Sequence, residues 1–131
     1  MIHKHPVLLA AALAALLLAA CGSGSDGEGA GSVTGAVAKI VVVDKENCCD
    51  CTRDRTECTL TVLNQALESS GIPVERLHVD TQEEAVAAYR AKKSFMVIPA
   101  VYFLGENGEV LHLLQGEVKE EQVLVALGRA G

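Results

Sequence analysis

Residues 38–51, with the sequence AKIVVVDKENCCDC, join an apolar run to a cluster of cysteines. The first six residues are rich in β-branched side chains and almost continuously apolar, which is typical of a strand buried on both faces. Cys48, Cys49 and Cys51 follow directly, and Cys58 stands seven residues after Cys51. We therefore expect the thiols to lie at the junction between a buried strand and a helix.

The rest of the chain predicts three helices and three further strands around this junction. The first helix follows the cysteines and stops at Gly71 and Pro73. Next come a strand over 74–79, a helix from Asp80 or Thr81 to about Lys92, a strand over 95–104 interrupted by Pro99, a strand over 110–114 and a helix over 117–127. Asn107-Gly108 indicates a tight hairpin with positive φ at both turn positions. The order β-α-β-α-β-β-α predicts one α/β domain with a mixed central sheet flanked by helices, its first two strands parallel and its last two antiparallel.

The charge balance narrows the classes of partner. The 131 residues contain 11 Lys and Arg against 17 Asp and Glu, and the formal net charge is −6. An acidic chain of this kind lacks the basic face with which proteins bind nucleic acid. We therefore expect no nucleic-acid partner.

The N-terminal residues 1–20 have the pattern of an export signal. An apolar Ala- and Leu-rich run over 7–20 is too short to span a bilayer and suits a signal-peptide core. It ends in Leu18-Ala19-Ala20-Cys21, which resembles a bacterial lipobox, and the resemblance implies a diacylglycerol on Cys21. An ordinary secretory signal or a short membrane anchor is the alternative. We expect an exported protein, lipid-anchored to a bacterial membrane, which would be the outer membrane in a two-membrane envelope.

Residues 21–36 are rich in Gly and Ser, with almost nothing to bury, and predict a flexible tether. The folded domain is expected over residues 37–131.

Several features together resemble the thioredoxin-like superfamily over residues 37–128. They are Cys48-x-x-Cys51 after a buried strand, Ile98-Pro99 before a later strand, the hairpin and the closing helix. The resemblance implies a thiol-disulfide oxidoreductase in which Cys48 attacks and Cys51 resolves the mixed disulfide. Such chemistry suits a helix N-terminus, because the attacking species is the thiolate and the helix dipole favours it. It also implies a cis Pro99 beside the thiols and a substrate chain bound at Ile98 and Pro99.

The chain departs from the usual family pattern in three places. Asn47 stands where a Trp is usual, and Cys49 and Asp50 stand between the two motif cysteines, where a carboxylate should oppose thiolate formation. Asp44 resembles the buried acid/base of the family, but it precedes Cys48 by four residues rather than six. A solvated aspartate at the end of the strand is the other interpretation of Asp44.

Cys49 and Cys58 leave alternatives open. They could form a second, structural disulfide, or act as accessory thiols that relay electrons to Cys48 and Cys51. All four thiolates, Cys48, Cys49, Cys51 and Cys58, could instead hold a soft metal ion such as Cu, Zn or Hg, for binding or delivery. A non-catalytic interaction module is the third class of function. The oxidoreductase interpretation needs no cofactor, and it expects envelope proteins with thiols or disulfides, and a redox partner protein, as partners.

Overall fold

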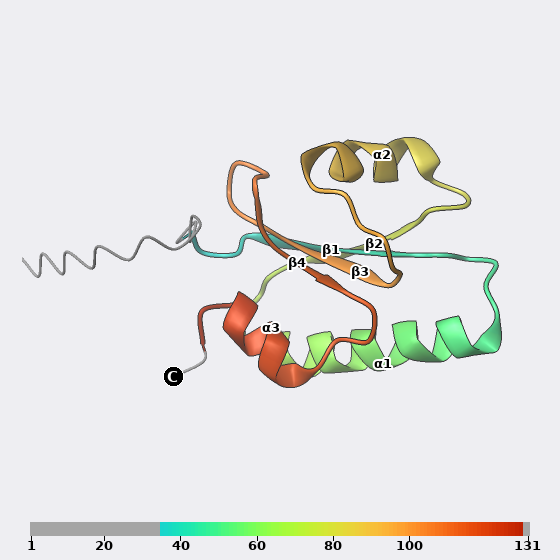
Figure 1. Cartoon of the computed structure of the whole chain (residues 1–131). Helices are drawn as coiled ribbons and strands as arrows, with labels where there is room; N and C mark the ends of the chain where they lie inside the picture. Colours follow the sequence, from blue (N-terminus) through green and yellow to red (C-terminus); the bar gives the residue numbers. More distant parts are fainter. Residues whose placement is uncertain (1–34, 130–131) are drawn as a thin grey trace, which may run out of the picture.

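The computed structural model describes residues 35–129, which form a four-stranded sheet and three helices (Figure 1). In chain order these elements are β1 (Lys39–Asp44), α1 (Asp50–Leu67), β2 (Val74–His78), α2 (Glu83–Lys92), β3 (Ala100–Leu104), β4 (Val110–Gln115) and α3 (Glu120–Ala126). The predicted β-α-β-α-β-β-α order is confirmed.

The sheet is mixed, with the strand order β2-β1-β3-β4. Strand β1 pairs with β2 in parallel and with β3 in the antiparallel sense, and β3 pairs with β4 as an antiparallel hairpin. Helices α1 and α3 cover one face of the sheet and α2 covers the other (Figure 1). The result is the α/β layering expected of a thioredoxin-like fold.

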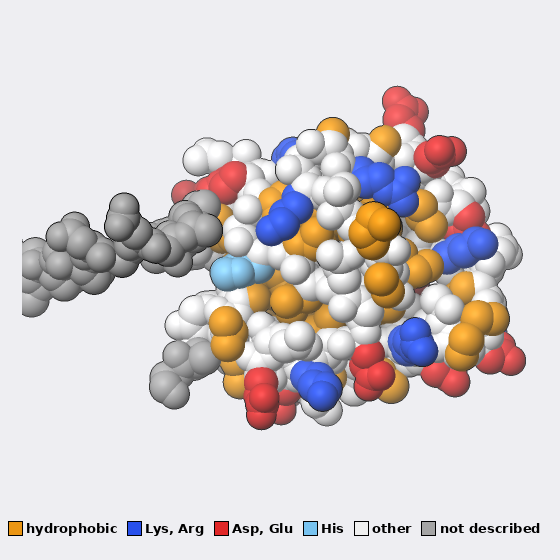
Figure 2. Space-filling view, in the orientation of Figure 1, with side chains coloured by type: hydrophobic (Ala, Val, Ile, Leu, Met, Phe, Trp, Pro, Cys, Tyr) orange, Lys and Arg blue, Asp and Glu red, His pale blue; other side chains and the backbone are white. Residues whose placement is uncertain are grey.

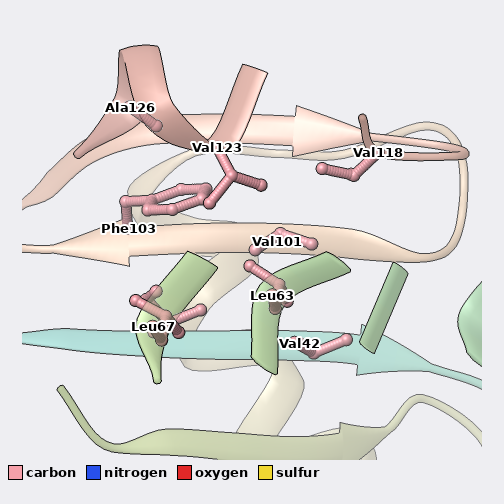
Figure 3. Close-up of a cluster of buried hydrophobic side chains, with 9 residues drawn as sticks. Val42, Leu63, Leu67, Val101, Phe103, Val118, Val123 and Ala126 are labelled. Atoms are coloured by element: carbon pink, nitrogen blue, oxygen red, sulfur yellow. The ribbon is translucent and has the colours of Figure 1, made fainter. Parts of the chain in front are cut away.

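Alternation along β1 and β3 divides the core into two clusters, one on each face of the sheet. Val42, Leu63 and Phe103 belong to the cluster under α1 and α3 (Figure 3). Tyr102 belongs to the cluster under α2, and its hydroxyl donates a hydrogen bond of 2.5 Å to the carbonyl of Lys93. Because successive strand residues point to opposite faces, a continuous apolar strand is required where both faces are covered.

Three local expectations are wrong. The third strand begins at Ala100 rather than near residue 95, because Pro99 has no N–H to donate to a ladder. The N-cap of α2 is Gln82, not Asp80 or Thr81. In the hairpin only Gly108 has a positive φ, +75°, and Gly105 donates to the carbonyl of Glu109, so the loop is longer than a two-residue turn.

The predicted signal peptide over 1–20, the predicted lipidation of Cys21 and most of the predicted 21–36 tether lie outside the described residues. Within residues 35–129, no helix is long and apolar enough to cross a membrane.

On the face shown in Figure 2, acidic and basic side chains are interspersed around apolar ones.

Candidate functional site

The start of α1 holds the cysteine cluster. Cys49 is the N-cap residue, with extended backbone angles (φ −66°, ψ 158°), and its carbonyl accepts hydrogen bonds from the N–H groups of Thr52 and Arg53, each at 3.1 Å. Cys51 follows as the second residue of the helix. This geometry brings the Cys49 and Cys51 sulfurs to 2.9 Å, and the Thr52 hydroxyl lies 3.3 Å from Cys49 Sγ.

The hydrogen-bond donors around Cys49 favour the thiolate form of its side chain. The Cys51 thiol and the Thr52 hydroxyl, in that order, donate to Cys49 and lower its pKa from 9.0 to about 7. Both the Cys49 and Cys51 residues are exposed to solvent. The site therefore holds an accessible, acidified thiol in contact with a second thiol, which is the combination that disulfide exchange requires.

The other two cysteines occupy different environments. Cys48 is half-buried, and its carbonyl accepts a 3.4 Å hydrogen bond from Arg53, which also pairs with Asp50 at 3.3 Å. Cys58 is exposed and lies within α1, two turns beyond Cys51. All four are present as thiols, and the pairing predicted for Cys48 and Cys51 stays a prediction.

A shared site for all four thiolates is not assembled. In the described part of the chain, no group of three or more His, Cys, Asp or Glu side chains is placed to hold one metal ion. Cys58 is too far along the helix to join the sulfurs at its start, because seven helical residues span about 10 Å.

The loop that precedes the thiols is hydrogen-bonded to Asp80, which lies in the connection between β2 and α2. One carboxylate oxygen of Asp80 accepts the Glu46 N–H at 2.9 Å, and the other accepts the Asn47 N–H at 2.9 Å and the Asn47 side-chain amide at 3.1 Å. These donors, the Asn47 N–H first, lower the pKa of Asp80 to about 2. Sequence reasoning treated Asp80 as a helix cap and missed this role.

Asp44 lies fully buried at the end of β1, so the solvated interpretation is wrong. Arg76 donates to one of its oxygens from Nε at 2.8 Å and from Nη2 at 2.5 Å, and His78 Nδ1 lies 2.5 Å from the other oxygen. The hydrogen bond with Asp44 raises the pKa of Arg76, which also contacts Glu57 on α1 at 3.6 Å. The acid/base role of Asp44 stays a prediction.

Sequence reasoning did not single out Arg76. A signal was available, because Arg76 and His78 alternate with the buried Leu77 along β2 and so share the face of the sheet under α1.

Pro99 lies at the same edge of the sheet as the thiol-bearing helix start. Val43, next to Asp44 at the end of β1, pairs with Ala100, the first residue of β3. The Ile98-Pro99 peptide bond is cis, as the resemblance implied. The preceding Met96 and Val97 are 90% and 49% exposed.

Gln115 fixes this segment from the neighbouring strand. Its side-chain oxygen accepts the Met96 N–H at 2.7 Å and the Val97 N–H at 3.2 Å. No local pattern marks Gln115 as a partner of this loop, because 18 or 19 residues separate them.

The fold and the site together define the class: a domain of thioredoxin-like α/β fold with three of its four described cysteines at the start of the first helix. Among solved structures, the chain resembles the thio-disulfide isomerase from Thermus thermophilus, with 18% sequence identity and a TM-score of 0.47. That alignment covers 69% of this chain and 76% of the isomerase. No protein-family model and no curated protein matches the sequence.

Proposed function

We propose that this chain is a membrane-anchored thiol-disulfide oxidoreductase that exchanges disulfides with envelope proteins. One observation carries the proposal: an exposed, acidified thiol, Cys49, lies 2.9 Å from a second exposed thiol, Cys51, at the N-terminus of α1. A thiolate in this position attacks a substrate disulfide, and a neighbouring thiol resolves the mixed disulfide.

The proposal extends to the surroundings of the thiols. The resemblance to the thioredoxin-like superfamily implies attack by Cys48 and resolution by Cys51, with Cys49 and Cys58 as accessory thiols. The exposed segment before Pro99 lies at the edge of the sheet where α1 starts, which supports Ile98 and Pro99 as the place where a substrate chain binds. Asp44 supplies the buried acid of the family pattern, already paired with Arg76.

The anchor is the part of the proposal that rests on sequence alone. A diacylglycerol on Cys21, with an acyl chain on its amine, would hold the protein durably, because two or more chains are needed for a stable anchor. Fatty-acid labelling in a bacterial host tests it: the native chain should carry label in the membrane fraction and the Cys21→Ser chain should not. Equal labelling of both chains would contradict the anchor.

A redox titration tests the exchange function. The full chain with Cys21→Ser is purified in mild detergent, equilibrated in glutathione buffers of increasing oxidised fraction, quenched with acid, alkylated and mapped by mass spectrometry. We expect one reversible disulfide within residues 48–51, unchanged by a chelator. The Cys58→Ser chain is the matched control, and it should titrate in the same way.

Two outcomes would overturn the oxidoreductase proposal. Thiols that resist alkylation until a chelator is added would indicate a metal-binding protein. A chain that forms no disulfide within residues 48–51 in any buffer would indicate an interaction module.

A further inference from the structure

We infer that the redox couple of this protein is Cys49–Cys51, with Cys49 as the attacking thiol and Cys51 as the resolving thiol. The inference rests on the proposed exchange function, but it replaces the Cys48–Cys51 couple that the resemblance implies. The redox-active motif is then Cys49-x-Cys51, and Cys48 does not take part in the couple.

The contact between the sulfurs is the main support. Cys49 Sγ and Cys51 Sγ lie 2.9 Å apart, and a disulfide bond is about 2.0 Å long, so closure needs an approach of about 0.9 Å. The extended backbone of Cys49 at the N-cap turns its side chain over the first helical turn, where Cys51 stands.

Cys48 is less well placed for either role. It is half-buried, whereas Cys49 and Cys51 are exposed. Within residues 35–129, no hydrogen bond joins the Cys48 sulfur to another cysteine, and its carbonyl is held by Arg53. A substrate disulfide in solvent therefore has freer access to Cys49 and Cys51 than to Cys48.

The charges around the pair suit a thiolate on Cys49. When Cys49 is a thiolate, the Cys51 thiol at 2.9 Å and the Thr52 hydroxyl at 3.3 Å can both donate to its sulfur. The carboxylate of Asp50 would oppose that charge, but its side chain is 93% exposed and pairs with Arg53. Water and Arg53 therefore screen Asp50, and the donors dominate.

Disulfide exchange at this pair takes two steps. The Cys49 thiolate attacks one sulfur of a substrate disulfide, so that a Cys49–substrate bond forms, the substrate S–S bond breaks and the second substrate sulfur leaves as a thiolate. Cys51, after losing its proton to solvent, attacks Cys49 Sγ, which forms the Cys49–Cys51 disulfide and releases the first substrate sulfur. The substrate gains two electrons and one proton, the equivalent of the proton that Cys51 released to solvent, and ends as one thiolate and one thiol. The Cys49 thiolate and Cys51 thiol are oxidised by two electrons to the disulfide. With a Cys49–Cys51 disulfide and a dithiol partner, the same steps run in reverse.

Mass mapping distinguishes the two couples directly. Trypsin cleaves after Lys45 and Arg53 and releases residues 46–53, ENCCDCTR, which contain the three clustered cysteines and separate them from Cys58. The reduced full chain with Cys21→Ser is treated with oxidised glutathione, quenched with acid, and alkylated before digestion. In the singly oxidised peptide, we expect the alkyl label on Cys48 if Cys49 and Cys51 are joined.

Three variants in the same background test the roles. Cys48→Ser should keep its rate of glutathione-disulfide reduction within about threefold of the parent, whereas Cys49→Ser should lose at least about tenfold, because only the attacking thiolate sets that rate. Cys51→Ser should accumulate glutathione on Cys49. The fully reduced variants should have the same far-UV circular dichroism spectrum as the parent. A lower rate of glutathione-disulfide reduction then reflects the missing thiol and not unfolding.

The possible outcomes distinguish a failure of the Cys49–Cys51 couple from a failure of the proposed exchange function. A label on Cys49, with Cys48 and Cys51 joined, or a lost rate in Cys48→Ser with a retained rate in Cys49→Ser, would overturn the inference and leave the exchange function standing. A parent chain that forms no disulfide within residues 46–53 would overturn both.

Discussion

Replacing Arg76 by Met isolates the energetic role of the polar cluster under the start of α1. The Asp44 side chain is 1% exposed, and its carboxylate accepts two hydrogen bonds from Arg76 and contacts His78 Nδ1. Arg76→Met keeps most of the apolar stem and removes the guanidinium. Asp44 then remains as a buried charge with His78 as its remaining partner in the described cluster.

The magnitude follows from the burial of Asp44 and the partial exposure of Arg76. Removing one partner of a buried ion pair costs about 3–5 kcal/mol. Arg76 is 38% exposed and His78 still pairs with one Asp44 oxygen, so we expect the lower end, about 3 kcal/mol. That is a large share of a typical unfolding free energy of about 5–15 kcal/mol.

Urea unfolding followed by far-UV circular dichroism measures this loss, since the chain has no Trp to serve as a fluorescence probe. Lys39→Met is the matched control, because Lys39 and Glu75 form an ion pair across the same two strands but are 39% and 42% exposed. It should cost about 1 kcal/mol or less. Adding Asp44→Asn to Arg76→Met should recover part of the loss. An Arg76→Met cost no larger than the control's would refute the reasoning.

Three further outcomes are expected. The rate of Cys49 alkylation should reach half its maximum near pH 7, because about half of Cys49 is thiolate at that pH, against about 1% of a thiol with a pKa of 9.0. Thr52→Val should shift this midpoint to higher pH, and a midpoint near pH 9 in the parent would contradict the hydrogen-bond donors described. Because the pKa of Asp80 is lowered, the stabilisation of the loop by Asp80 is complete above pH 3.8 and is lost as the pH falls through about 2. The NMR chemical shifts of the Glu46 and Asn47 amide protons should change with a midpoint at that pH, and a midpoint near pH 4 would contradict the hydrogen bonds to Asp80. Leu63→Ala should cost about 2–5 kcal/mol in urea unfolding, since Leu63 is fully buried, and a cost under 1 kcal/mol would place it outside the core.

Much of the architecture could be predicted from local patterns. The β-branched run of β1 indicated a strand covered on both faces, and its consecutive residues Val41 and Val42 do pack into opposite clusters. Element ends were less predictable. Pro99 sits inside an apolar run, yet the strand begins only after it. Periodicity senses which side chains are buried, and it does not sense which backbone groups are paired in a ladder.

The sequence by itself determined the order of the elements and the position of the thiols at a junction between a strand and a helix, because periodicity, glycine and proline act on nearby residues. Only the tertiary structure decided what surrounds those thiols. Asp44 meets Arg76 and His78 across 32 and 34 residues, and Asp80 reaches Asn47 across 33. The parallel register of β1 and β2 creates the Asp44 contacts, and no local pattern encodes register between distant strands. Which two sulfurs meet depends likewise on the backbone angles of one residue, Cys49, where the helix begins.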